Sequence, residues 1–243
     1  MKTFFQLEIY YLKHKKGDFL MTEMTTKTLN YAKDNKERMP WEHYLNEFKK
    51  LDPVEVSNRV KIPYNEETQN FTLNFLGATY YIHYPDFQVT HEDDNMISHP
   101  LEDNIYAKIL ICRYLQRANP TSTSGNFLSY RDIPWGETYF TQFSGRCIMR
   151  LAYKYGYSIE TFGKIMDSIG AERVSSGDIA YDLKLLDGLF IRFIIWAADD
   201  EFPPSAQILF SDNFPSSFTA EDLAYVGDIC INTFGAVGKS LSK

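Results

Sequence analysis

Residues 178–212 read DIAYDLKLLDGLFIRFIIWAADDEFPPSAQILFSD, and this stretch decides the fold. Asp187-Gly188 separates two runs rich in aliphatic and aromatic residues. An Asp-Gly pair in that setting is a strong signal for a β-hairpin, because glycine accepts the positive φ that such a turn requires. A third apolar run follows the Pro203-Pro204 break and ends at Asp212. The stretch therefore predicts the core of a β-sheet.

The second apolar run, from Leu189 to Trp196, is interrupted only by Arg192. Near-continuous apolar sequence of this kind is typical of a central strand that is covered on both faces. We therefore expect Trp196 to be buried at the end of a central strand, and we expect helices to supply the cover.

A second hairpin is predicted over Phe71 to Val89, where Gly77 separates two alternating runs, and we expect it to join the same sheet. The turn-rich stretch before residue 138 could hold one short strand over 127–131. Apolar periodicity and capping signals predict the helices that surround these strands. They start at Pro40 and Pro53 and run over 100–117, 138–155, 158–170 and 219–234. The predicted fold class is α+β, with a mainly antiparallel sheet and helices packed on it.

The chain of 243 residues is 44% hydrophobic and 16% aromatic, so it can bury a sizeable core. No stretch has the composition of a linker, which predicts a single domain over 1–243. Residues 1–20 precede two further methionines, Met21 and Met24, and could be an N-terminal extension.

The formal charge of −7 argues against a general nucleic-acid binder. No apolar run approaches the ~20 residues of a membrane helix, so no membrane partner is expected. Cys112, Cys147 and Cys230 are widely spaced in apolar surroundings, which predicts buried thiols and a cytoplasmic protein. Residues 199–243 hold two basic and seven acidic side chains, so a ligand of this third of the chain should be cationic.

The sequence nominates one candidate ligand-binding site, formed by Asp199, Asp200, Glu201 and Asp212 at strand ends. If these carboxylates gather at one edge of the sheet, they suit Ca²⁺, Mg²⁺ or an amine-bearing ligand. The alternative is an acidic turn in water, where charge and proline discourage edge-to-edge aggregation.

Other motifs give weaker signals. Three histidines recur every eight residues (His83, His91 and His99) but lack any familiar metal-ligand spacing, so we interpret them as loop residues. Tyr130, Arg131, Trp135 and Tyr139 could line a pocket for a planar ligand, although aromatic residues beside a helix start are more often core. The fingerprints of a serine nucleophile, a P-loop and a dinucleotide site are missing, and the sequence leaves any cofactor unknown.

Asp200-Glu201-Phe202-Pro203, followed by Leu209-Phe210, resembles domain-of-unknown-function family 3786, which is marked by Asp-Glu-Phe-Pro and Leu-Phe-Asp. The resemblance extends to Trp196, Glu221-Asp222 and the Phe75-Leu76-Gly77 of the first hairpin, and covers roughly residues 50–235. One motif differs, because Ser211 separates Phe210 from Asp212.

The resemblance implies no assigned activity. Some members of the family look like fusions to iron–sulfur cluster domains in anaerobes with one-carbon and corrinoid chemistry. The three separated cysteines of this chain offer no cluster that could hold such a centre. The resemblance therefore implies a stand-alone accessory version, with an iron–sulfur or corrinoid protein as its partner.

Two functions follow. The first hypothesis is a cytoplasmic, non-enzymatic binding or accessory module of anaerobic metabolism, because no nucleophile–base pair or cofactor fingerprint is found. The alternative is a divalent-metal-dependent enzyme, such as a hydrolase, that uses Asp199, Asp200, Glu201 and Asp212.

Overall fold

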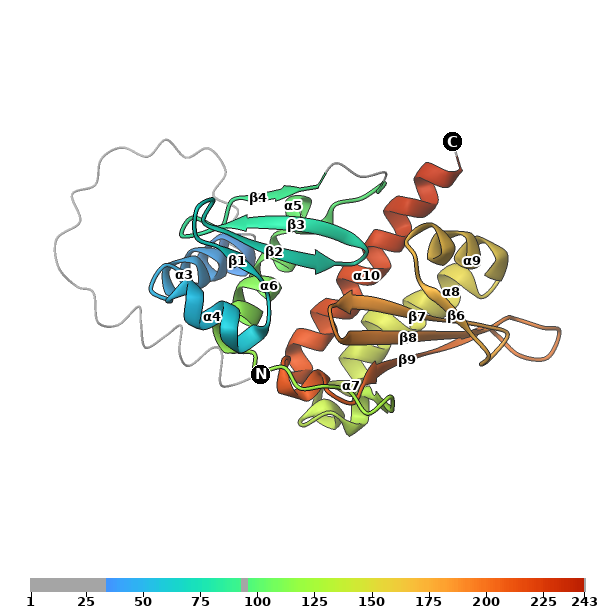
Figure 1. Cartoon of the computed structure of the whole chain (residues 1–243). Helices are drawn as coiled ribbons and strands as arrows, with labels where there is room; N and C mark the ends of the chain where they lie inside the picture. The colour runs from blue at the N-terminus through green and yellow to red at the C-terminus, as the bar shows by residue number, and fades with distance from the viewer. Residues whose placement is uncertain (1–33, 93–95, 243) are drawn as a thin grey trace, which may run out of the picture.

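A computed structural model describes residues 34–92 and 96–242. It confirms the α+β class, with antiparallel sheets and helices packed on them, although the strands form two sheets and not one (Figure 1). The possible N-terminal extension, residues 1–20, lies outside the described residues. Within the described ranges, no helix is long and apolar enough to cross a membrane.

The four-stranded sheet contains the first predicted hairpin and has the order β1-β2-β3-β4. Its strands are β1 (Tyr64–Asn65), β2 (Asn70–Phe75), β3 (Ala78–His83) and β4 (Val89–His91). The five-stranded sheet has the order β5-β9-β8-β7-β6. Its strands are β5 (Phe127–Ser129), β6 (Glu172–Val174), β7 (Ile179–Leu186), β8 (Leu189–Trp196) and β9 (Ser205–Ser211). The predicted hairpin at Asp187-Gly188 is confirmed, with Gly188 at φ +80°.

The prediction that the first hairpin joins the central sheet is wrong, because the hairpin belongs to the four-stranded sheet. Its turn contacts β7 of the five-stranded sheet through a hydrogen bond. The backbone N–H of Leu76 donates to the carbonyl of Leu185 at 3.1 Å. Leu185 lies at a register irregularity between Lys184 and Leu186, where a ladder partner is missing. Gly77 has φ +89°, and an added Cβ would meet the carbonyl oxygen of Ile169 at 3.0 Å, so glycine is required in this turn.

Helix α4 begins at Pro53 as predicted, whereas Pro40 is the second residue of α3, which continues from a π-helical segment (Asp34–Arg38). α3 (Met39–Phe48) buries Tyr44 and Phe48. α4 (Pro53–Val60) is capped by Asp52, whose carboxylate accepts from two backbone N–H groups. The predicted helix over 100–117 is interrupted at Asn104, which ends α5 (Pro100–Asp103) and caps α6 (Ile105–Arg117).

The remaining helices cover one face of the five-stranded sheet (Figure 1). They are α7 (Gly136–Phe143), α8 (Met149–Tyr155), α9 (Ile159–Ser168) and α10 (Ala220–Leu241), and a π-helical segment (Ser144–Ile148) joins α7 to α8. α10 begins at the predicted capping box of Thr219 and Asp222 and contacts both α6 and α9. One apolar cluster contains residues of both sheets, and within it Phe193 of β8 meets Phe234 of α10 edge-on, with ring centroids 5.1 Å apart.

Only one face of β8 is fully covered, contrary to the prediction. Leu189, Ile191, Phe193 and Ile195 are almost completely buried against the helices. On the second face the cover is partial: Phe190 and Arg192 are half-buried, Ile194 is buried, and Trp196 is 39% exposed. Arg192 lies on this second face and forms a bidentate ion pair with Asp182 of β7, at 2.7 and 2.8 Å. Because side chains alternate along a strand, Trp196 shares this second face with Arg192, and as the last residue of β8 it is not buried.

Candidate functional site

Asp199, Asp200 and Glu201 lie in the loop that connects β8 to β9, and this loop projects beyond the end of the sheet (Figure 1). The Asp199 carboxylate accepts hydrogen bonds from the backbone N–H groups of Glu201, at 2.9 Å, and Phe202, at 2.7 Å. The Asp199 N–H donates in turn to the Phe202 carbonyl at 3.1 Å. Asp199 therefore shapes the loop, whereas Asp200 and Glu201 extend into solvent.

Asp212 lies at the opposite end of the sheet, so the four predicted site residues do not converge. Ser205, at the start of β9, is paired with Trp196, whereas Ser211, at the other end, is paired with Phe127. Seven residues of strand span roughly 20 Å. In an antiparallel pair, the carboxyl ends of the two strands lie at opposite ends of the sheet. The acids that follow β8 are therefore separated from the acid that follows β9.

The Asp212 carboxylate is held by its own neighbours. It accepts from the Thr123 hydroxyl at 2.6 Å, and from the backbone N–H and the hydroxyl of Ser124. The hydrogen bond from the Ser124 side chain is the main cause that lowers the pKa of Asp212 below its usual value, because these donors stabilise the ionised form. Across the described part of the chain, no three His, Cys, Asp or Glu side chains are grouped as a metal site.

Three exposed aromatic residues lie in or near the acidic loop. Phe202 is 66% exposed at its tip, Trp196 is 39% exposed at the end of β8, and Tyr157 is 68% exposed. Tyr157 follows Gly156, whose carbonyl accepts from the Ala198 N–H at 3.0 Å, so it lies beside the start of the loop. We call the exposed tip of this loop, formed by Asp200, Glu201 and Phe202, the loop face.

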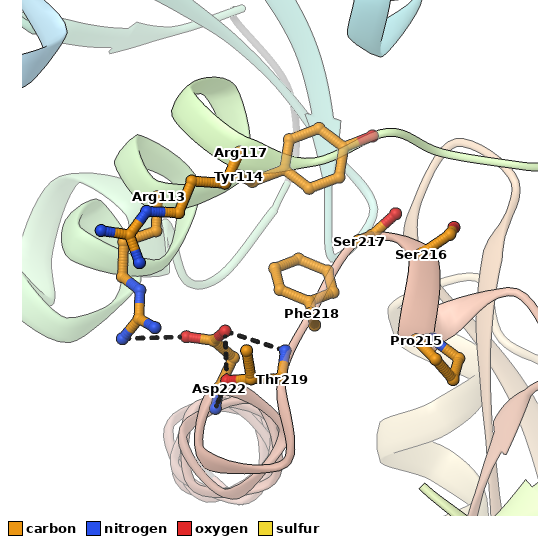
Figure 2. A pocket seen from close by; sticks show the side chains of 9 residues that line it. All are labelled: Arg113, Tyr114, Arg117, Pro215, Ser216, Ser217, Phe218, Thr219 and Asp222. Carbon is orange, nitrogen blue, oxygen red and sulfur yellow. Dashed lines mark hydrogen bonds and ion pairs between the residues drawn. The ribbon is translucent and has the colours of Figure 1, made fainter. Parts of the chain in front are cut away.

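A pocket that the sequence analysis missed lies between the last turn of α6 and the start of α10 (Figure 2). It has a volume of about 170 Å³. Arg113 and Arg117 of α6 form one side, and Phe218, Thr219 and Asp222 form another. The available sequence signal was a pair of arginines one helical turn apart on a helix with several buried apolar residues.

Comparison with protein families gives one match. The model of the family described as "Domain of unknown function (DUF3786)" matches residues 52–233. The chain belongs to this family. No curated protein and no solved structure matches it.

The residues that carry the resemblance to DUF3786 lie in a hairpin turn, in the loop between β8 and β9, and at the start of α10. Phe75, Leu76 and Gly77 form the hairpin turn that contacts β7. Asp200-Glu201-Phe202-Pro203 contains the loop face. Glu221 and Asp222 lie in the first turn of α10, where Asp222 completes the capping box.

The histidines are partly in strands, not only in loops. His83 ends β3, and its Nδ1 lies 2.7 Å from the Asp86 carboxylate. His91 ends β4, with its Nδ1 2.9 Å from Glu102 and its ring stacked on His99 at 3.6 Å. These are pairwise contacts between neighbouring side chains.

The predicted pocket for a planar ligand is not formed by its four residues. Tyr130 is buried, stacks on Phe143 at 3.9 Å and donates its hydroxyl to the Ala220 carbonyl at 2.6 Å. The other three lie at the surface: Arg131 pairs with Glu137 at 3.1 Å, Trp135 is 79% exposed and Tyr139 is 37% exposed.

All three cysteines are buried free thiols, as predicted. Burial raises the pKa of the Cys112 and Cys147 thiols to about 12 and also raises the pKa of Cys230. Since the thiolate is the reactive and metal-binding form, these cysteines are structural residues.

Proposed function

We propose that this protein is a non-enzymatic accessory module that binds a partner protein through the loop face. The observation that carries the proposal is the exposed Phe202, which the hydrogen bonds of Asp199 hold at the tip of a projecting loop. An exposed aromatic side chain on an ordered backbone is a typical anchor of a protein interface.

The arrangement also limits the entropy cost of binding. Asp199 accepts from two backbone N–H groups of the loop, and Pro203-Pro204 restricts the chain after it. An added Cβ on Gly156 would lie 2.2 Å from Pro204 Cβ, so the loop base is in close contact with the end of α8. A pre-organised loop loses little conformational freedom when a partner covers it, which favours binding.

The charge of the loop face indicates the kind of partner. Asp200 and Glu201 directly precede Phe202 in the loop, and both are exposed. Acidic side chains beside an exposed aromatic residue speed association with a basic surface and disfavour acidic ones. The partner should therefore present basic side chains around an apolar pocket.

The DUF3786 resemblance supplies the candidates. It implies an anaerobic context in which an iron–sulfur or corrinoid protein is the partner. The buried, free thiols support a reducing cytoplasm as the location. The carboxylate-based metal enzyme has less support, because Asp212 lies at the far end of β9 from Asp199.

The test is a binding titration of the full chain against the iron–sulfur protein and the corrinoid protein encoded nearest to its gene. We expect Phe202→Ser to weaken binding by roughly 30-fold, the equivalent of a ~2 kcal/mol interface anchor. Trp135→Asn is the matched control, since Trp135 is 79% exposed outside the loop face and asparagine tolerates its φ of +68°. Equal loss with both variants, or no binding of either protein by the wild-type chain, would refute the proposal.

A further inference from the structure

The pocket between α6 and α10 carries an excess of positive charge. Arg113 and Arg117 lie one helical turn apart, and their guanidinium carbons are 5.4 and 5.9 Å from the centre of the Tyr44 ring. One carboxylate faces them: Asp222 Oδ1 is 3.1 Å from Arg113 Nη1. In the part of the chain that the structure describes, no carboxylate lies within ion-pair distance of Arg117. Two cations therefore share one anion.

The shared carboxylate is already in use. Asp222 Oδ2 accepts from the Thr219 N–H at 3.0 Å and from the Thr219 hydroxyl at 2.7 Å (Figure 2). These bonds fix the first turn of α10 and keep the carboxylate from moving toward Arg117. Asp222 thus neutralises Arg113 and leaves the charge of Arg117 unmatched.

Over the described residues, neither arginine of this pair hydrogen-bonds the last carbonyls of α6. Cations at a helix C-terminus interact favourably with the exposed carbonyls of the last turn. In α6 that position is taken by Arg59, which donates to the carbonyls of Leu115, at 2.6 Å, and Gln116, at 3.2 Å, and also to Ala118. Arg117 is therefore available to the pocket, next to Arg113 with its ion pair to Asp222.

Two buried donors at the pocket also have no partner among the described residues. They are Nε of Arg113, whose side chain is 13% exposed, and the hydroxyl of Ser217, across the pocket from the arginines. Buried polar groups in proteins are nearly always hydrogen-bonded, so an unpartnered guanidinium N–H beside an unmatched cation indicates a missing acceptor. Oxyanions are the acceptors that guanidinium groups recognise best.

We propose that this pocket binds a small oxyanion, a carboxylate or a phosphate group, through Arg113 and Arg117. Its volume of about 170 Å³ is below the roughly 300 Å³ at which sites for larger organic ligands begin, so the ligand has few non-hydrogen atoms. Phe218 and Tyr114, with ring centroids 5.4 Å apart, form an apolar wall that strengthens the electrostatic attraction by excluding water.

Calorimetric titration of the full chain with inorganic phosphate, and separately with acetate, tests the proposal at constant ionic strength. Arg117→Met removes the unmatched charge from an exposed position and leaves the core unchanged. We expect it to weaken binding about tenfold or more, as expected for the loss of a charge-assisted hydrogen bond. Lys164→Met, which removes one charge from an exposed position on α9, is the matched control and should change the affinity less than about twofold.

Asp222→Asn separates a binding effect from damage to the fold. It removes the competing carboxylate, so we expect tighter oxyanion binding even though the variant is less stable. Binding of phosphate alone or of acetate alone, with the Arg117 dependence, identifies the phosphate or the carboxylate as the ligand group. Absence of binding by both, an affinity that Arg117→Met leaves unchanged, or weaker binding by Asp222→Asn would overturn the proposal.

Discussion

Asp222 makes two separate contacts at the start of α10, and replacing it with alanine removes both. Loss of its hydrogen bonds to Thr219 removes a helix cap, which costs about 1 kcal/mol. Loss of its ion pair leaves Arg113 without a carboxylate, and breaking a buried pair in this way costs roughly 3–5 kcal/mol. Because Arg113 borders a pocket, we take the lower part of that range and expect Asp222→Ala to reduce the free energy of unfolding by about 3–4 kcal/mol in total.

Urea unfolding followed by circular dichroism measures this change, and two further variants test its origin. Thr219→Ala removes only the cap contact and should cost about 1 kcal/mol. Combining Arg113→Met with Asp222→Ala should cost less than the sum of the single changes, because the unpaired charge is then absent. The reasoning is refuted if Asp222→Ala costs under about 1 kcal/mol, or if the two changes add within about 0.5 kcal/mol.

Three further predictions concern the sheets and their ends. Phe193→Ala should lower the free energy of unfolding by about 3–5 kcal/mol and Trp196→Ala by only roughly 1–2 kcal/mol, since Phe193 is fully buried and Trp196 is 39% exposed. Equal losses in chemical denaturation would contradict this difference in burial. Gly77→Ala should lower the melting temperature, since an alanine at φ +89° is strained, and an unchanged melting temperature would contradict the assigned turn. Ser124→Ala should raise the pKa of Asp212 toward its ordinary value in a carboxyl NMR titration. Because folding lowers this pKa, ionised Asp212 stabilises the folded protein above the ordinary carboxyl pKa, and this contribution is lost as the pH falls through the folded value. The difference in unfolding free energy between wild type and Ser124→Ala should therefore vanish in acid. A difference that persists in acid would contradict this linkage.

The features that the sequence predicted correctly depend on residues close together in the chain. Asp187-Gly188 specifies a hairpin, and Thr219 with Asp222 specifies a capping box, because each signal is complete within a few residues. The division into two sheets depends on which distant strands pair, and alternation within a strand contains no information on its partner. The first hairpin was therefore placed in the wrong sheet.

The four acids of the candidate site are separated for a related reason. Asp199 and Asp212 each follow a strand, but the antiparallel pairing of β8 with β9 puts them at opposite ends of the sheet. The pocket escaped prediction because Arg113 and Asp222 are distant in sequence and meet only after α6 packs on α10. The part of that site that the sequence can show is the pair Arg113 and Arg117, one turn apart on a predicted helix.

The hydrogen bond between Leu76 and Leu185 joins the two sheets. Residues 64–91 complete one sheet, and strands β6 to β9 complete most of the other, so each sheet forms mainly from segments close in sequence. Units of this kind often open as separate foldons in native-state hydrogen exchange. The Leu76 amide is bonded across the joint, outside the ladders of its own sheet. Its exchange rate therefore reports the separation of the two sheets, while the ladder amides of β2 and β3 report the unfolding of one.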